Sequence, residues 1–147
     1  MKKTIHPIAG TIAMVCIASF WLSTLISELF LSQEAVVLVK HSILQAMWIM
    51  IPAMAAVGGS GFALSRVRKG NLLAVKKKRM QLIAANGILI LLPCAFYLYY
   101  KAAAGEINAT FYALQVVELV AGATNFSLMT LNFRDGLKLS GRLRRKG

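Results

Sequence analysis

Four long apolar runs constrain the fold of this chain more than any other feature of its sequence. Each run reaches the roughly 20 residues that a helix needs to cross the hydrocarbon core of a bilayer. Only helices and closed barrels satisfy their backbone groups in lipid, and these runs are too long and continuous for barrel strands. The short first and third connections predict neighbouring helices that run in opposite directions. We therefore expect an all-α, antiparallel bundle of four transmembrane helices, at residues 8–31, 36–64, 80–100 and 107–133.

The composition agrees with lipid as the solvent. The chain is 58% hydrophobic and 15% charged, whereas about a quarter of the residues of a soluble domain are charged. Because the apolar runs use most of the chain, we interpret residues 1–147 as one integral membrane domain. The net charge of +12 is compatible with nucleic-acid binding. We exclude that partner because the basic residues cluster beside the apolar runs, where membrane topology explains them.

The basic clusters also predict an orientation. Fifteen of the 17 Lys and Arg residues lie before the first run, in a basic loop at residues 65–79, or in a basic tail at residues 134–147. Segments rich in Lys and Arg stay on the cytoplasmic side of a membrane. We therefore expect a multi-pass protein of a bacterial-type inner membrane with both termini and the basic loop in the cytoplasm. The loop and the tail are also expected to attract acidic lipids.

The fourth run carries a polar stripe. Gln115, Glu118, Gly122, Asn125 and Met129 recur at spacings of three and four, so they share one helix face. Counting along the helix places Glu118 about 20 Å from the cytoplasmic edge of a span of about 30 Å. Ionisable groups at such depth are costly and usually functional. We expect Glu118 to face the bundle interior and to be the residue most closely tied to function. A protonated carboxyl group that serves packing alone is the other interpretation.

The same depth count suggests partners for this stripe. Asn86 in the third run lies at nearly the depth of Asn125, so we predict a hydrogen bond between their side chains, with a structural role favoured over a site role. Gln115, Glu118, Asn125 and Asn86 form the candidate intramembrane polar site.

The partners of Glu118 are expected around Ser19 and Ser23 of the first run and residues 47–52 of the second. Burial disfavours a charged carboxylate, so we expect Glu118 to be mostly protonated unless a cation or water reaches it.

A second polar cluster is expected at the outer end. Glu28 ends the first run, while Lys40 and His41 begin the second, and the tight turn between the runs sets residue 28 opposite residue 40. A Glu28–Lys40 ion pair at the headgroup level is the favoured interpretation, acting as a topology clamp. In the alternative, the cluster is an outward-facing site in which His41 exchanges protons near neutral pH.

The histidines also bear on haem. His6 and His41 are expected at opposite ends of the bundle, so within one chain they cannot ligate the same haem b iron. Ligation by one His with one of the seven methionines, or by two subunits, stays open. Cys16 and Cys94 lie inside apolar runs and are interpreted as small hydrophobic residues.

Three functional classes follow from these residues. Because no catalytic motif is present, we lean away from an enzyme. The main hypothesis is a small polytopic membrane protein with a titratable interior site, acting in transport or as an accessory subunit. The alternatives are an electron-transfer component that binds haem b or quinone, and a scaffold or assembly subunit of a larger membrane complex. A homo-oligomer is compatible with each class.

Overall fold

The computed structural model describes residues 2–65 and 71–139, and these residues are almost entirely helical. The elements are α1 (Lys2–Phe30), α2 (Gln33–Ser65), α3 (Asn71–Asn86), the π-helix η1 (Gly87–Leu91), α4 (Leu92–Ala103) and α5 (Ala109–Leu139). Four helical stretches are long and apolar enough to cross a membrane: His6–Phe30, Gln33–Gly61, Asn71–Ala103 and Ala109–Lys138. The expectation of an all-α protein with four such helices is confirmed.

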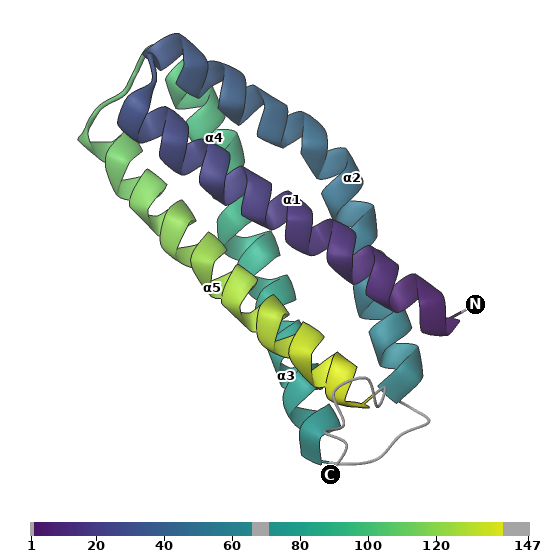
Figure 1. The fold of residues 1–147 in the computed structure, drawn as a ribbon. Coiled ribbons are helices and arrows are strands. Elements are labelled where there is room, and N and C mark those ends of the chain that lie inside the picture. The colour runs from purple at the N-terminus through teal and green to yellow at the C-terminus, as the bar shows by residue number, and fades with distance from the viewer. Residues whose placement is uncertain (1, 66–70, 140–147) are drawn as a thin grey trace.

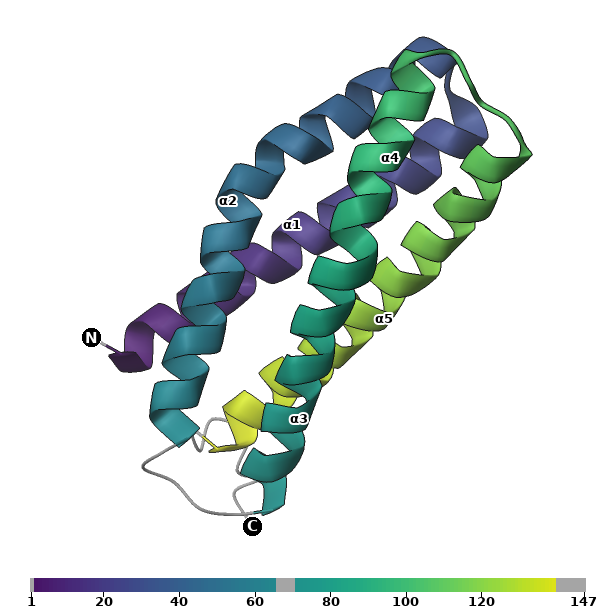
Figure 2. The ribbon, with the colours of Figure 1, turned by 180° about the vertical axis from the view of Figure 1, so that it is seen from behind.

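The four spans occupy the four corners of a bundle (Figures 1 and 2). Helix α1 packs against α2 and α5, while the third span, α3 to α4, also packs against α2 and α5. Along the described residues α2 and α5 make no close backbone contact, so they occupy opposite corners. Both short connections, between α1 and α2 and between α4 and α5, lie at one end of the bundle, and the N-terminus lies toward the other (Figure 1).

The third span begins earlier than the sequence suggests. Helix α3 starts at Asn71 rather than at Met80, so the end of the expected basic loop continues directly into the span. Lys and Arg are good helix formers, and Arg79 is tied to Asp135 of α5 by an ion pair. This contact holds the extension against its neighbour. The remainder of the loop, residues 66–70, lies outside the described residues.

A π-helix interrupts the third span immediately before Pro93. The backbone N–H of Leu92 donates to the carbonyl oxygen of Gly87, five residues earlier. Proline has no N–H and cannot continue the α-helical pattern, which is a common reason for such a distortion. The sequence predicts a kink at Pro93, and the structure accommodates this proline with a widened turn.

The widened turn keeps one face of the third span inside the bundle. In an uninterrupted α-helix, at about 100° per residue, Ala95 and Ala102 would lie about 120° and 100° around the axis from Ile83. Absorbing one residue in η1 turns them back by about 100°, into line with Ile83. Accordingly Ile83, Ala95 and Ala102 are all buried, at 4%, 3% and 3% exposure.

Helix α2 contains Pro52 near its middle and stays helical on both sides of it. Figure 2 shows that the two halves of α2 run in different directions, as expected for a helix that loses one internal hydrogen bond at a proline.

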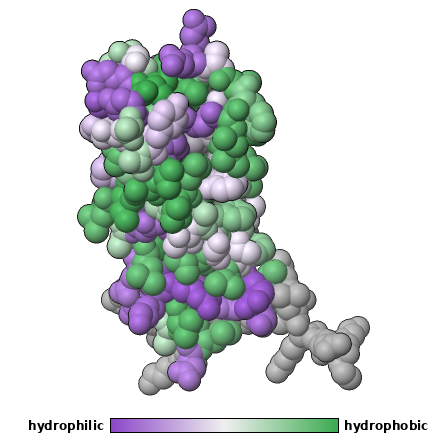
Figure 3. Space-filling model, turned by 90° about the vertical axis from the view of Figure 1, so that its left-hand side faces the viewer, coloured by the Kyte–Doolittle hydropathy of each residue, from purple (hydrophilic) through white to green (hydrophobic). Residues whose placement is uncertain are grey.

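Apolar side chains cover much of the outer surface. Trp48, Leu89 and Phe30 are 83%, 73% and 78% exposed. On the face shown in Figure 3, hydrophobic side chains gather over the middle of the molecule and hydrophilic ones toward its two ends. Such a surface suits a bilayer, where apolar side chains meet lipid and charged ones meet the headgroups.

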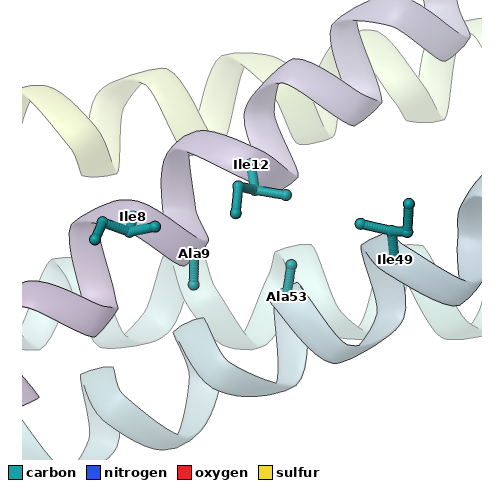
Figure 4. Close-up of a pocket in the computed structure, with 5 residues that line it drawn as sticks. All are labelled: Ile8, Ala9, Ile12, Ile49 and Ala53. Carbon is teal, nitrogen blue, oxygen red and sulfur yellow. The ribbon is translucent and has the colours of Figure 1, made fainter.

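A shallow groove between α1 and α2 belongs to this apolar surface. It is lined by Ile8, Ala9 and Ile12 of α1 and by Ile49 and Ala53 of α2 (Figure 4). Its lining side chains carry no polar group, so the groove offers no chemistry beyond contact with hydrocarbon.

Among the described residues, the core consists of three apolar clusters. Their buried members come from every span. The clusters are Val36, Cys94, Leu98, Ala102 and Phe111; Ile43, Met47 and Ala95; and Ala13, Ile17, Ile83 and Met129.

Candidate functional site

An ion pair between Lys40 and Glu118 lies inside the bundle. The ammonium nitrogen of Lys40 is 2.6 Å from Oε2 of Glu118, and the side chains are 1% and 13% exposed. Lys40 belongs to α2 and Glu118 to α5, the helices at opposite corners, so the long lysine side chain crosses the bundle interior. A buried ammonium without a counter-charge would cost several kcal/mol. The sequence predicts a protonated Glu118 unless a cation reaches it, and in the structure the cation of Lys40 does reach it.

Gln115 extends this pair along α5. Its Nε2 donates to Oε2 of Glu118 at 3.1 Å, and the residue is 3% exposed. A carboxylate oxygen only accepts hydrogen bonds, so this contact fixes which end of the amide faces Glu118. The other end, Oε1 of Gln115, is buried and has no hydrogen-bond partner. Gln115 therefore presents an unused acceptor inside the bundle.

Glu28 of α1 presents a second unused acceptor. Its Oε1 is buried and has no hydrogen-bond partner, and its carboxyl group lies within electrostatic range of both Lys40 and Glu118. The expected ion pair between Glu28 and Lys40 is wrong, since Lys40 makes its ion pair with Glu118. The hairpin argument considered only α1 and α2, whereas the lysine points into the interior and reaches α5. Lys40 is thus buried inside the bundle and paired across it.

The third span contributes Cys94. This cysteine is 7% exposed and lies within electrostatic range of Lys40 and Glu118. On α1, the turn before Glu28 carries Thr24 and Ser27, which are 3% and 0% exposed. All four spans therefore contribute to one site. We call it the interior polar cluster; its members are Glu28, Lys40, Cys94, Gln115 and Glu118.

The level of the cluster differs from the sequence-based expectation. The partner of Glu118 on α2 is Lys40, rather than a residue in the range 47–52. On α1, the hydroxyl of Ser23 donates to the carbonyl oxygen of Phe20, and Ser19 is exposed. The expected hydroxyl contacts to Glu118 are replaced by the lysine, which satisfies the carboxylate better.

The polar stripe of α5 faces inward as predicted. Gln115, Gly122, Asn125 and Met129 are buried, and Glu118 is mostly so. At Gly122 the absence of a side chain matters, because a Cβ there would lie 3.2 Å from Cδ1 of a tryptophan of α1. The helices α1 and α5 approach closely at this point.

The predicted hydrogen bond between Asn86 and Asn125 is confirmed. Nδ2 of Asn86 donates to Oδ1 of Asn125 at 2.9 Å and also to the carbonyl oxygen of Ala121. In turn, Nδ2 of Asn125 donates to the carbonyl oxygen of Ile83 at 3.3 Å. Asn125 lies two turns from Glu118, about 10 Å along the helix. The asparagines form a separate layer that links α3 to α5, so the candidate intramembrane site divides into two.

His41 does not join the interior polar cluster. It is exposed, its Nε2 lies 3.1 Å from Nε2 of Gln45, and its ring packs on Tyr99 at 5.4 Å between centroids. Near the opposite end of the bundle, Nδ1 of His6 lies 2.9 Å from Oγ of Ser60. One haem cannot bridge these two histidines within a chain. In residues 2–65 and 71–139, no group of three His, Cys, Asp or Glu side chains is placed to hold a metal ion.

Asp135 is a buried charged residue that the sequence analysis did not assign. It is 2% exposed, and its Oδ2 lies 2.6 Å from Nη1 of Arg79, while Arg134 approaches within 3.8 Å. Asn132, one turn earlier, is 8% exposed with an unpartnered Oδ1. Both continue the three-and-four spacing of the α5 stripe beyond Met129. That spacing was the signal available in the sequence.

Comparison of the chain with protein-family models, with curated proteins and with solved structures gives no match.

Proposed function

We propose that this chain is a multi-pass inner-membrane protein of transport type, whose interior polar cluster binds and releases protons. The observation that supports this most directly is the Lys40–Glu118 ion pair, 2.6 Å long and buried between helices at opposite corners. Ionisable groups at membrane depth are expensive, and they commonly mark ion and proton pathways. A bundle that needed only packing at this level could use apolar side chains at lower cost.

Glu28 gives the lysine a second carboxylate within its electrostatic range. A proton that moves from Glu28 to Glu118 neutralises the partner of Lys40, and the ammonium is then attracted to the ionised Glu28 instead. Loss of that proton restores the original pair. In a medium of low effective dielectric constant these groups interact strongly, so a proton bound by one of them changes the attraction between the others. Lys40 thereby acts as the moving charge that links protonation to helix packing.

The proposal includes an antiparallel arrangement with both termini in the cytoplasm. Reporter fusions test this directly: a fusion after Lys146 is expected to give a cytoplasmic signal, and a fusion at Gly105, in the connection before α5, a periplasmic one. The reason is the distribution of basic residues, fifteen of which lie in the proposed cytoplasmic segments. A periplasmic signal from the C-terminal fusion would contradict the orientation. The same basic segments are proposed to bind acidic lipids.

The transport role predicts proton movement through the purified protein. In vesicles that contain a pH-sensitive dye, a potassium diffusion potential set by valinomycin is expected to drive protons inward faster with the protein than without it. Glu118→Gln keeps the shape of the side chain but removes its titration, so the rate should fall to that of protein-free vesicles. Glu34→Gln is the matched control, because Glu34 is exposed at the start of α2. This variant should retain the wild-type rate.

One result would refute the proposal, and two controls guard against a variant that has lost its fold. Equal rates for wild-type protein and empty vesicles would refute proton transport by this chain. The first control is gel filtration of Glu118→Gln, with equal amounts reconstituted, to establish that this variant is folded. The second is the double variant Lys40→Met with Glu118→Gln, which has no unpaired charge and should show the same loss of proton movement.

A further inference from the structure

The geometry points to a binding site for one small alkali-metal cation, with Na⁺ as the probe, inside the interior polar cluster. Oε1 of Glu28 and Oε1 of Gln115 would be its protein ligands. This inference rests on the proposed function, because it names the ion that competes with the proton at the same site. The cation would take the place of the proton on Glu28.

The first argument is the pair of unused acceptors. Oε1 of Glu28 and Oε1 of Gln115 are both buried and have no hydrogen-bond partner. Buried polar atoms without partners cost free energy and need an explanation, such as an unseen ion or water. Gln115 is 3% exposed, and the bond from its Nε2 to Glu118 anchors its amide in the cluster. Its free oxygen belongs to the same amide group that contacts Glu118, and so lies beside the Lys40–Glu118 pair.

The second argument is the charge count. Glu28 and Glu118 supply two carboxylates, whereas Lys40 supplies one ammonium group. Fully ionised, the cluster carries one excess negative charge, which is costly in the interior of a membrane bundle. One proton or one monovalent cation neutralises it. A divalent ion would leave an excess positive charge instead.

The third argument concerns the type of cation. The free groups are a carboxylate oxygen and an amide oxygen, which are ligands of hard cations. Both oxygens are fully shielded from solvent by the surrounding helices. This favours a compact inorganic ion over a bulky organic cation.

The exchange balances in charge and in protons. In the absence of the cation, the carboxyl group of Glu28 holds a proton. When the cation binds, that proton leaves, so one proton is released for each cation bound and the charge of the cluster stays the same. The other ionisable groups that face the site are Lys40 of α2, Cys94 of α4 and Glu118 of α5. The Lys40–Glu118 pair stays intact in both states.

A tryptophan reports on the site. Nε1 of Trp21 donates to the carbonyl oxygen of Leu119, the residue after Glu118, at 2.9 Å. The chain has two tryptophans, and Trp48 is 83% exposed. The Trp48→Phe variant therefore leaves Trp21 as the single emitter, located beside the interior polar cluster.

The experiment titrates this full-length variant in detergent with NaCl. Each addition of NaCl replaces an equal amount of N-methylglucamine chloride, so the ionic strength stays constant. We expect a saturable change in Trp21 emission. The NaCl concentration that gives half of this change should rise by about tenfold for each unit by which the pH is lowered, because one proton competes with one cation. A pH-indicator dye in weakly buffered solution should record about one proton released per protein. Adding Glu28→Gln should abolish both signals, whereas adding Glu34→Gln, on an exposed residue, should leave them unchanged.

The outcomes separate cleanly. No saturable change, the same change with N-methylglucamine, or an unchanged response in Glu28→Gln would each overturn the cation site. Gln115→Leu removes the second ligand without a change in charge and must weaken binding by at least tenfold if the site is as proposed. Because binding is measured in detergent, it is independent of transport. Proton flux without Na⁺ binding would defeat this inference alone, and Na⁺ binding without proton flux would defeat the transport proposal alone.

Discussion

Lys40→Met is expected to lower the free energy of unfolding by about 3 kcal/mol, because breaking a buried ion pair leaves its partner without compensation. Lys40 is 1% exposed and Glu118 is 13% exposed, so little solvent screens the loss. The measurement is equilibrium unfolding in mixed micelles, followed by Trp21 emission in the Trp48→Phe background.

Removing both charges should restore most of this stability. The double variant Lys40→Met with Glu118→Gln has no unpaired ion, and replacing both members of a buried pair is often close to neutral. Lys101→Met is the control, since its partner Glu106 is 56% exposed at the end of the bundle and the pair is screened by water. If Lys40→Met lowers the free energy of unfolding no more than Lys101→Met does, the interior ion pair contributes nothing to folding.

Asp135→Asn is expected to have a comparable effect, again about 3 kcal/mol. Asp135 is 3% exposed in its side chain and lies 2.6 Å from Arg79. Lys76 also approaches it, since a Cβ on Gly136 would lie 3.0 Å from Nζ of Lys76. Without the carboxylate, Lys76 and Arg79, which lie one turn apart on α3, lose their shared counter-charge, and the junction between α3 and α5 should open.

Two comparisons check this interpretation. Adding Lys76→Met to Asp135→Asn should recover part of the loss, because it removes one of the repelling cations. Arg134→Gln should change stability little, since Arg134 is 55% exposed and 3.8 Å from Asp135. If Asp135→Asn unfolds at the same denaturant concentration as the wild type, Asp135 does not stabilise the junction between α3 and α5.

The fold was largely predictable because membrane helices follow from length and hydropathy. Each of the four apolar runs became a helix long enough to span a bilayer. The inward face of α5 was also predictable, since the spacing of its polar residues decides it locally. The Asn86–Asn125 hydrogen bond followed from depth counting alone, because the two residues lie at nearly the same depth in their spans.

The interior polar cluster was harder to predict because its main contact is not between neighbours in sequence. Lys40 was assigned to Glu28 by the geometry of a two-helix hairpin, whereas its partner lies 78 residues away on the opposite corner of the bundle. Which helices are diagonal depends on the packing of all four spans. Asp135 was missed for a related reason: beside so many basic residues, its charge looked like part of a solvated tail.

The π-helix η1 decides on which face of the third span its second polar layer lies. The asparagine layer includes Asn86, just before η1, and the interior polar cluster includes Cys94, just after it. A regular α-helix of unchanged length over Gly87–Leu91 would turn everything after it by about 100°. Leu98, which is 0% exposed, would then leave the core. A change that removes the widened turn but keeps the chain length should therefore be more damaging than a one-residue deletion within Gly87–Leu91, which keeps the same face inward.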